Sequence, residues 1–173
     1  MAVLPVLAYP DARLQRVSVP VECFDDDLRK FAGDLTETMY AGPGGVGIAA
    51  PQVDRLLRIV VVDVRPRLGE ACHGLMVLIN PELVAWEGMA VGREGCMSVP
   101  DFTGNVIRAE KIQVRARDVQ GRDRFYECEG FEARAVQHEM DHLDGLLFLD
   151  RLVSRKTDLF RRKKYQTREP GPA

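Results

Sequence analysis

The chain lacks several features that mark large classes of proteins. Its longest apolar runs, such as RIVVVDV at 58–64, have the length of a strand and are far too short to span a membrane. The first residues, MAVLPVLAYPDARL, contain no basic segment followed by a long apolar stretch, so we expect neither export nor membrane insertion. The four cysteines form no C-x-x-C pair, which argues against both a disulfide framework and a four-cysteine zinc ribbon. These absences predict a cytoplasmic protein with reduced thiols.

A large net charge and low-complexity segments are also missing. The 173 residues are 46% hydrophobic and 29% charged, with a formal net charge of -2, which is typical of a globular protein and names no partner. No internal repeat or Pro/Gly/Ser-rich linker divides the chain. We therefore expect residues 1–173 to form a single domain.

The hydrophobic pattern predicts a mixture of helices and short strands. A helix is expected from about Asp25, as its cap, to Met39, and the glycines of AGPGGVG end it. Strand patterns follow in RIVVVDV, LMVLINPELVAW, IQVRARD and RFYECEG, with a turn at Gln120 and Gly121, and they favour antiparallel pairing. A second helix is predicted from Phe131 to a stop at Gly145, and a last one over roughly 154–166.

Histidine is scarce, yet two of the three histidines lie in VQHEMDHLDG at 136–145. This H-E-x-x-H motif places His138 and His142 four positions apart, on one face of a helix and about 6 Å apart along its axis. Both imidazoles can then bind one metal ion, with Glu139 beside it. The competing interpretation, two ordinary histidines beside an ordinary glutamate, fits this spacing poorly.

A catalytic ion of this kind needs a third protein ligand and an open position for water. The third histidine of the metzincin pattern is replaced by Phe148. The only downstream glutamate, Glu169, lies in a Pro/Gly-flanked tail, and His73 falls in a loop where a solvated role is more common. Cys96, in the Gly-flanked GREGCMSVP segment, which we expect to be irregular and to lie between strands, is the better candidate. From context alone, a metal ligand and a small buried hydrophobe remain open for it.

Three motifs in this order resemble peptide deformylase: GVGIAAPQ, EGCMS and QHEMDH. The similarity extends through LAYPDARL and VIRAEKIQVRARDVQG, and so covers most of the chain. The resemblance implies an α+β fold with antiparallel β-sheets packed around a central metal-binding helix, and a C-terminal helix. It implies that Cys96, His138 and His142 bind one divalent ion, Fe(II) or else zinc, nickel or cobalt. The implied reaction removes the formyl group from the N-terminal methionine of newly made proteins.

The same resemblance assigns further roles. Glu139 is expected to transfer protons, and the Gln52 amide and the Met97 backbone N–H to stabilise the oxyanion. The main chain at Gly45, Val46, Gly47 and Gly95 is expected to meet the peptide, with a methionine pocket near Val46, Arg134, Ala135 and His138. Two alternatives remain for Arg134 besides the solvated surface: it could contact the substrate backbone, or pair with an acid such as Glu94. The family usually has leucine where Met97 stands, which matters little for a backbone role.

The end of the chain is strongly basic. Residues 151–168 contain eight basic residues and one acid, hence +7, so the remainder of this chain of -2 carries -9. A solvated charged helix is the usual interpretation, but a nascent-chain substrate emerges from a ribosome, whose RNA attracts such a segment. We therefore predict ribosome docking through a basic C-terminal helix and tail at 153–173. The host is expected to be a bacterium, or the protein a mature organellar form.

Two other functions compete with deformylation. A zinc endopeptidase would need a third His or Glu ligand in place of Cys96. A metal-stabilised module without catalysis could dock on ribosomes through the basic tail alone.

Overall fold

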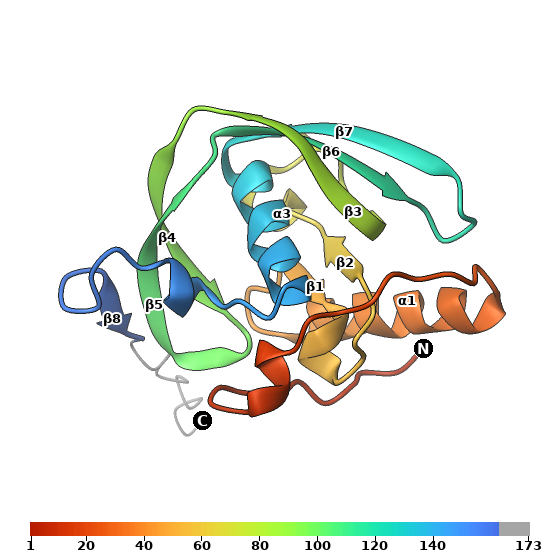
Figure 1. Cartoon of the computed structure of the whole chain (residues 1–173), viewed down its shortest axis with the longest axis horizontal. Coiled ribbons are helices and arrows are strands. Elements are labelled where there is room, and N and C mark those ends of the chain that lie inside the picture. The colour runs from red at the N-terminus through yellow and green to blue at the C-terminus, as the bar shows by residue number, and fades with distance from the viewer. Residues whose placement is uncertain (163–173) are drawn as a thin grey trace, which may run out of the picture.

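The computed structural model describes residues 1–162 of the chain (Figure 1). Its first long helix is α1 (Asp26–Ala41), and the Asp25 side chain caps it by accepting the N–H of Leu28 at 2.9 Å. The helix buries Leu28, Phe31, Leu35 and Met39, the residues that recur at helical spacing, and it ends at Gly42. The sequence-based prediction of this helix is confirmed.

A five-stranded antiparallel sheet forms the larger part of the core. Its order is β1-β2-β3-β6-β7. The strands are β1 (Gly47–Ala49), β2 (Ile59–Val62), β3 (Met76–Glu87), β6 (Lys111–Arg117) and β7 (Asp123–Glu129). The four strand patterns read from the sequence fall on β2, β3, β6 and β7, and the turn at Gln120 and Gly121 is confirmed, with Gly121 at φ +80. Short helices η2 (Ala50–Val53) and α2 (Arg65–Leu68) connect strands of this sheet.

A second sheet has the order β4-β5-β8, with β4 (Ala90–Cys96), β5 (Val99–Arg108) and β8 (Leu159–Arg161). It corrects two predictions. The GREGCMSVP segment is not irregular, because most of it belongs to β4 and β5 and Cys96 is the last residue of β4. The helix predicted over 154–166 does not form at 154–162, where a turn leads into β8; residues 163–166 lie outside the described residues.

Residues 154–158 form no helix because the turn they make allows the following residues to pair with β5 as strand β8. Leu159 and Phe160 pair with Gly104 and Thr103 of β5, and Asp158 accepts the N–H of Ser154 at 2.9 Å. Edge pairing with β5 thus outweighs the helical propensity of a short basic segment.

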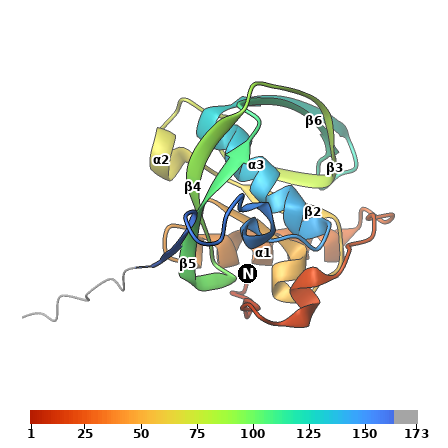
Figure 2. The ribbon, with the colours of Figure 1, turned by 60° about the vertical axis from the view of Figure 1, so that its left-hand side comes forward.

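Helix α3 (Gly130–Leu143) runs through the centre of the molecule, between the two sheets and beside β1 and β2 (Figures 1 and 2). Its apolar residues Ala133, Ala135, Val136 and Leu143 are buried in the core of the larger sheet. The chain leaves the helix through Gly145 at φ +74, as predicted. The expected α+β fold with antiparallel sheets around a central helix is therefore confirmed. Among residues 1–162, no helix combines the length and the apolar character that a bilayer span requires.

Candidate metal centre

Helix α3 presents His138 and His142 on one face, as the sequence predicts. Their ring centroids lie 5.2 Å apart with an interplanar angle of 76°, and both side chains are buried. Because the helix passes between the two sheets, this face points at the end of β4. The helix thus brings two imidazoles to residues that are far away in the sequence.

Strand β4 supplies the third donor. Cys96 lies on the same face of β4 as Glu94, two residues earlier, so strand alternation points its side chain inward, where the residue is 5% exposed. Cys96 Sγ lies 3.4 Å from His142 Nε2, close to the separation of roughly 3.5 Å between sulfur and nitrogen ligands of a tetrahedral ion. The donor atoms of Cys96, His138 and His142 all lie within 4.8 Å of one another. The structure therefore brings together the three residues predicted to bind metal.

The electrostatics of this group favour a cation. Burial opposes charge on His138, but Cys96 and Glu94 outweigh it and raise the pKa of His138 well above its usual value. Burial holds the pKa of His142 well below its usual value, so that imidazole is neutral and able to donate an electron pair to a metal. Two buried atoms, Glu139 Oε2 and His142 Nδ1, have no hydrogen-bond partner among the described residues. A cysteine sulfur together with two imidazole nitrogens is a donor set that fits a divalent transition metal.

Glu139 lies beside the metal donors. Its Oε2 is 4.0 Å from His142 Nε2, and its side chain is 7% exposed. Burial raises the pKa of Glu139 to about 7, which places it in the range that suits a general base at neutral pH.

Glu94 positions the predicted metal ligand His138, a role that the sequence motifs did not indicate. Its Oε1 accepts the Nδ1 proton of His138 at 2.8 Å, which leaves His138 Nε2 for the metal. Arg108 donates to both carboxylate oxygens at 2.9 Å, and Arg134 donates to Oε2 alone at 2.8 Å. Burial raises the pKa of Glu94, but His138 and Arg108 outweigh this effect and keep that pKa well below its usual value. Arg108 also binds Asp141 of α3, which Arg151 holds in turn.

The contacts of Arg134 decide between two of its three alternatives, the pair with an acid and the solvated surface. Besides Glu94, it donates to the carbonyls of Val106 at 2.9 Å and Ala90 at 2.8 Å. Its guanidinium lies over Gly92, where an added β-carbon would be only 2.7 Å from Cζ. Arg134 therefore joins α3 to the second sheet through Glu94, as one sequence-based alternative held, and it is not a solvated surface residue.

Gln52 reaches the centre from η2. Its Oε1 accepts the N–H of Ala49 at 2.8 Å, so its Nε2 is turned toward the thiol side, where it lies 3.0 Å from Ser98 Oγ and 3.6 Å from Cys96 Sγ. Met97 follows Cys96 directly, and its side chain packs against the core beside α1. Both predicted oxyanion donors thus come to the same end of β4.

The glycine-rich segment lies on the other side of the centre. Val46 packs against the core that contains Ala135, and its carbonyl accepts the N–H of Asp63 at 2.9 Å. Gly47 begins β1 directly against the Glu139 carboxyl, and Gly45 lies against the Met39 carbonyl. Gly95 pairs with Thr103 next to Cys96. Gly47 and Gly95 thus flank the metal donors, and Gly45 lies in the turn after α1.

Comparison with known proteins agrees with this geometry. The family model described as Polypeptide deformylase matches residues 3–158. The chain belongs to the peptide deformylase family. A peptide deformylase of Alkalilimnicola ehrlichii is 49% identical, over 94% of this chain and 89% of its own length. A crystal structure of the Legionella pneumophila peptide deformylase matches with a TM-score of 0.82 and 41% identity, covering 90% of this chain and 89% of that one.

A third match is a peptide deformylase of Acinetobacter baumannii with Met-Ala-Ser bound, with a TM-score of 0.81 and 39% identity over 87% of this chain and 99% of that one. Membership of the peptide deformylase family defines the activity. The chain is a metal-dependent hydrolase that removes the N-formyl group from the N-terminal methionine of newly synthesised proteins and releases formate. The zinc endopeptidase and the non-catalytic module are thereby set aside.

Proposed function

We propose that Cys96, His138 and His142 hold one divalent ion, with Fe(II) as the ion used in the cell and zinc, nickel or cobalt able to replace it. The observation that carries this proposal is the set of three donor atoms within 4.8 Å of one another, all buried. Such an ion, when bound, lowers the pKa of a coordinated water toward 7 and polarises the formyl group. The Glu94 carboxylate orients His138 for this role, with its charge balanced by Arg108 and Arg134.

Glu139 moves the protons of the reaction. It accepts one proton from the attacking water as the new C–O bond forms at the formyl carbon. It then gives a proton to the amine of methionine as the C–N bond breaks and formate leaves. Its raised pKa of about 7 supports both steps, because neither the charged nor the neutral carboxyl is strongly favoured at neutral pH.

Gln52 and Met97 stabilise the negative charge that grows on the formyl oxygen. Gln52 Nε2 has two protons, and its position between Ser98 Oγ and Cys96 Sγ directs one of them toward the metal side. The Met97 backbone N–H is the second donor. Loss of one such donor typically costs about 3 to 4 kcal/mol of transition-state stabilisation.

The substrate's main chain lies along Gly45, Val46, Gly47 and Gly95, and its methionine side chain enters a pocket near Val46, Arg134, Ala135 and His138. The packing of Val46 against the core that contains Ala135 supports an apolar wall. Because the guanidinium of Arg134 is tied to Glu94, Arg134 contributes its aliphatic stem to this wall and not its charge.

Residues 1–173 act as one cytoplasmic catalytic domain, whose basic C-terminal segment contacts the ribosome. The exposed side chains of Arg155, Lys156 and Arg161 support a polar contact surface in the described part of that segment. Binding to ribosomes should weaken steeply with salt, because phosphate contacts release counterions. Salt-insensitive binding, or none at low salt, would remove this part of the proposal.

The role of Glu139 is tested with Glu139→Gln. This variant should fold and retain one metal ion per chain, yet hydrolyse a formyl-Met peptide about 100-fold to 10,000-fold more slowly, the usual range for general acid-base catalysis. Activity close to wild type would show that another group moves the proton.

A further inference from the structure

A second group of metal-binding side chains lies away from the catalytic centre, at the N-terminal end of α3. His73 comes from the loop between α2 and β3, Cys128 from β7 and Glu132 from the first turn of α3. The nitrogen, sulfur and oxygen atoms that they offer lie within 4.8 Å of one another. Cys128 and Glu132 are buried, whereas the His73 side chain is 38% exposed, so the group opens to solvent on the His73 side.

Hydrogen bonds between His73 and Glu132 already hold two of the three donor side chains together. Glu132 Oε1 lies 2.6 Å from His73 Nδ1, and Glu132 Oε2 accepts the backbone N–H of His73 at 2.9 Å. The His73 ring also packs edge-on against Tyr126, with 5.3 Å between ring centroids. The loop is thus held on α3 by two hydrogen bonds to the Glu132 carboxylate, one from the His73 backbone and one from its ring.

The surroundings add negative charge. The three donors line a cavity of about 590 Å³, together with Cys72. The charged residues of its lining are four carboxylates and one ammonium, from Glu87, Glu127, Glu129, Glu132 and Lys111. Strand alternation places Glu87, Lys111, Glu127 and Glu129 on the opposite face of the sheet from Cys128, so Glu132 is the carboxylate whose charge favours a cation at the donor atoms themselves.

We propose that His73, Cys128 and Glu132 form a second, non-catalytic site for a divalent thiophilic ion such as Zn(II). A thiolate, an imidazole and a carboxylate are the three ligand types that zinc takes, and water or the Cys72 thiol can fill the fourth position. Tetrahedral zinc separates such donors by roughly 3.3 to 3.8 Å, given its bond lengths. His73 Nδ1 and Glu132 Oε1 must therefore part by about 1 Å, a movement that the partly exposed loop allows.

Ion binding at this site releases a proton from Cys128. Burial, and then the negative charge of Glu132, raise the pKa of Cys128 to about 12, so the thiol is neutral without metal. The ion would tie the 69–75 loop to the first turn of the helix that carries His138, six residues and about 9 Å further along its axis. We expect the ion to raise the thermal stability of the protein as well.

The test counts metal in the holoenzyme. Protein whose catalytic centre is filled with Ni(II) is dialysed against micromolar Zn(II) at mildly alkaline pH, and the metal content per chain is measured by mass spectrometry. Wild type should reach two ions per chain, and Cys128→Ser and His73→Ala should each stay near one. Wild type that stays at one, or variants that reach two, would overturn the proposal. His73→Ala changes a partly exposed loop residue, so it decides the matter if Cys128→Ser fails to fold.

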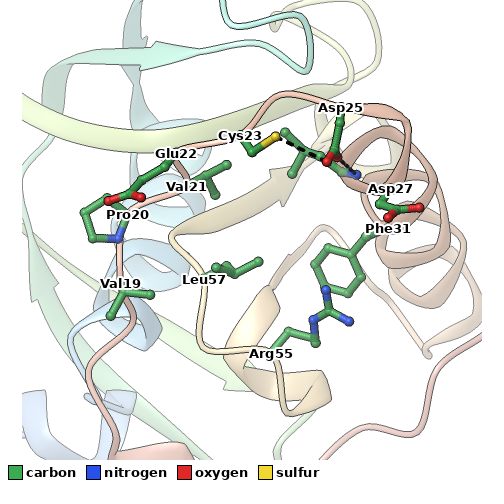
Figure 3. A pocket seen from close by; sticks show the side chains of 11 residues that line it. Val19, Pro20, Val21, Glu22, Cys23, Asp25, Asp27, Phe31, Arg55 and Leu57 are labelled. Carbon is green, nitrogen blue, oxygen red and sulfur yellow. Dashed lines mark hydrogen bonds between the residues drawn. The ribbon is translucent and has the colours of Figure 1, made fainter.

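The matched control is another cysteine beside a carboxylate. Cys23 lies on the wall of a separate cavity between residues 19–25 and α1, with its Sγ 3.3 Å from Asp25 Oδ2 (Figure 3). No histidine lines that cavity. Cys23→Ser should bind the second ion as wild type does, and loss of the ion in this variant would mean that binding has nothing to do with His73 and Cys128.

Discussion

A β-carbon added to Gly47 would lie 2.5 Å from Oε1 and 2.8 Å from Cγ of Glu139. Such distances are too short for a stable contact, so the carboxyl would have to move. Gly47→Ala should therefore displace the general base and lower kcat/KM by about 100-fold, the usual cost of a misplacement of about 1 Å, with metal content unchanged. Formate release and metal analysis on the same sample check this prediction.

Gly33→Ala is the matched control for that substitution. Gly33 lies inside α1, where an added β-carbon would meet only the flexible end of Met1, at 3.3 Å from Sδ. Alanine should keep full activity there and raise stability by about 0.5 to 1 kcal/mol, because it loses less backbone entropy than glycine in a helix. Equal loss of activity in both variants would contradict the steric explanation.

The carboxylate of Glu94 is expected to set metal affinity through His138. Glu94→Gln removes the charge that holds the Nδ1 proton and disturbs the pair with Arg108, so metal affinity should fall by about 10-fold to 100-fold. Competition with a chelator measures the change. Glu110→Gln, on the surface, should leave the affinity as in wild type, and an unchanged affinity in Glu94→Gln would show that His138 needs no such support.

Because Cys96 is a sulfur ligand, the loss of activity in air should depend on which metal ion is bound. Iron-loaded protein should lose activity aerobically, because Fe(II) or the Cys96 thiolate is oxidised, whereas nickel-loaded protein should stay active. The decay of formate release over time, with and without oxygen, gives the comparison. Equal decay of the two forms would remove the argument for iron.

Asp118 at the turn between β6 and β7 should make stability depend on acid pH. Burial raises its pKa, but the backbone N–H groups of Arg122 and Gln120 and the guanidinium groups of Arg122 and Arg124 outweigh this and lower it to about 2. The folded pKa lies below the unfolded value of about 3.9, so this stabilisation is complete above that pH and is lost as the pH falls toward 2.

Asp118→Asn should accordingly have a lower Tm than wild type at pH 6, and the difference should shrink as the pH falls below 4. Thermal unfolding at several pH values, down to the lowest at which both proteins fold, provides the test. Asp123→Asn, at a side chain that is 85% exposed, should show little difference at any pH. A gap between Asp118→Asn and wild type that stays constant with pH would contradict this account.

Local patterns were enough to predict α1, α3 and the strands β2, β3, β6 and β7, because each carries either an apolar period or a continuous apolar run. Strands β4 and β5 were missed since Gly92, Gly95 and charged residues interrupt the alternation in β4, whose pairing with β5 follows from tertiary contacts. The prediction of a C-terminal helix was wrong at 154–162 because β8 forms there instead. Its partner β5 is more than 50 residues away in sequence, so no local pattern indicates this pairing.

The metal centre, too, could be predicted from local sequence patterns only in part. His138, Glu139 and His142 follow from helical spacing, and Cys96 needed the family resemblance. The buried link from His138 through Glu94 and Arg108 to Asp141 has no local signal, because the residues of each hydrogen-bonded pair are 14 to 44 positions apart along the chain. Only the packing of α3 against the second sheet brings these charges together.

The most direct test is formate release from formyl-Met-Ala-Ser by anaerobically purified wild-type protein, with metal analysis of the same sample. The account predicts that formate release rises in proportion to the metal bound at the centre, disappears after chelation and returns on reloading with Fe(II) or Ni(II). Protein that is fully loaded with metal and yet releases no formate would contradict it.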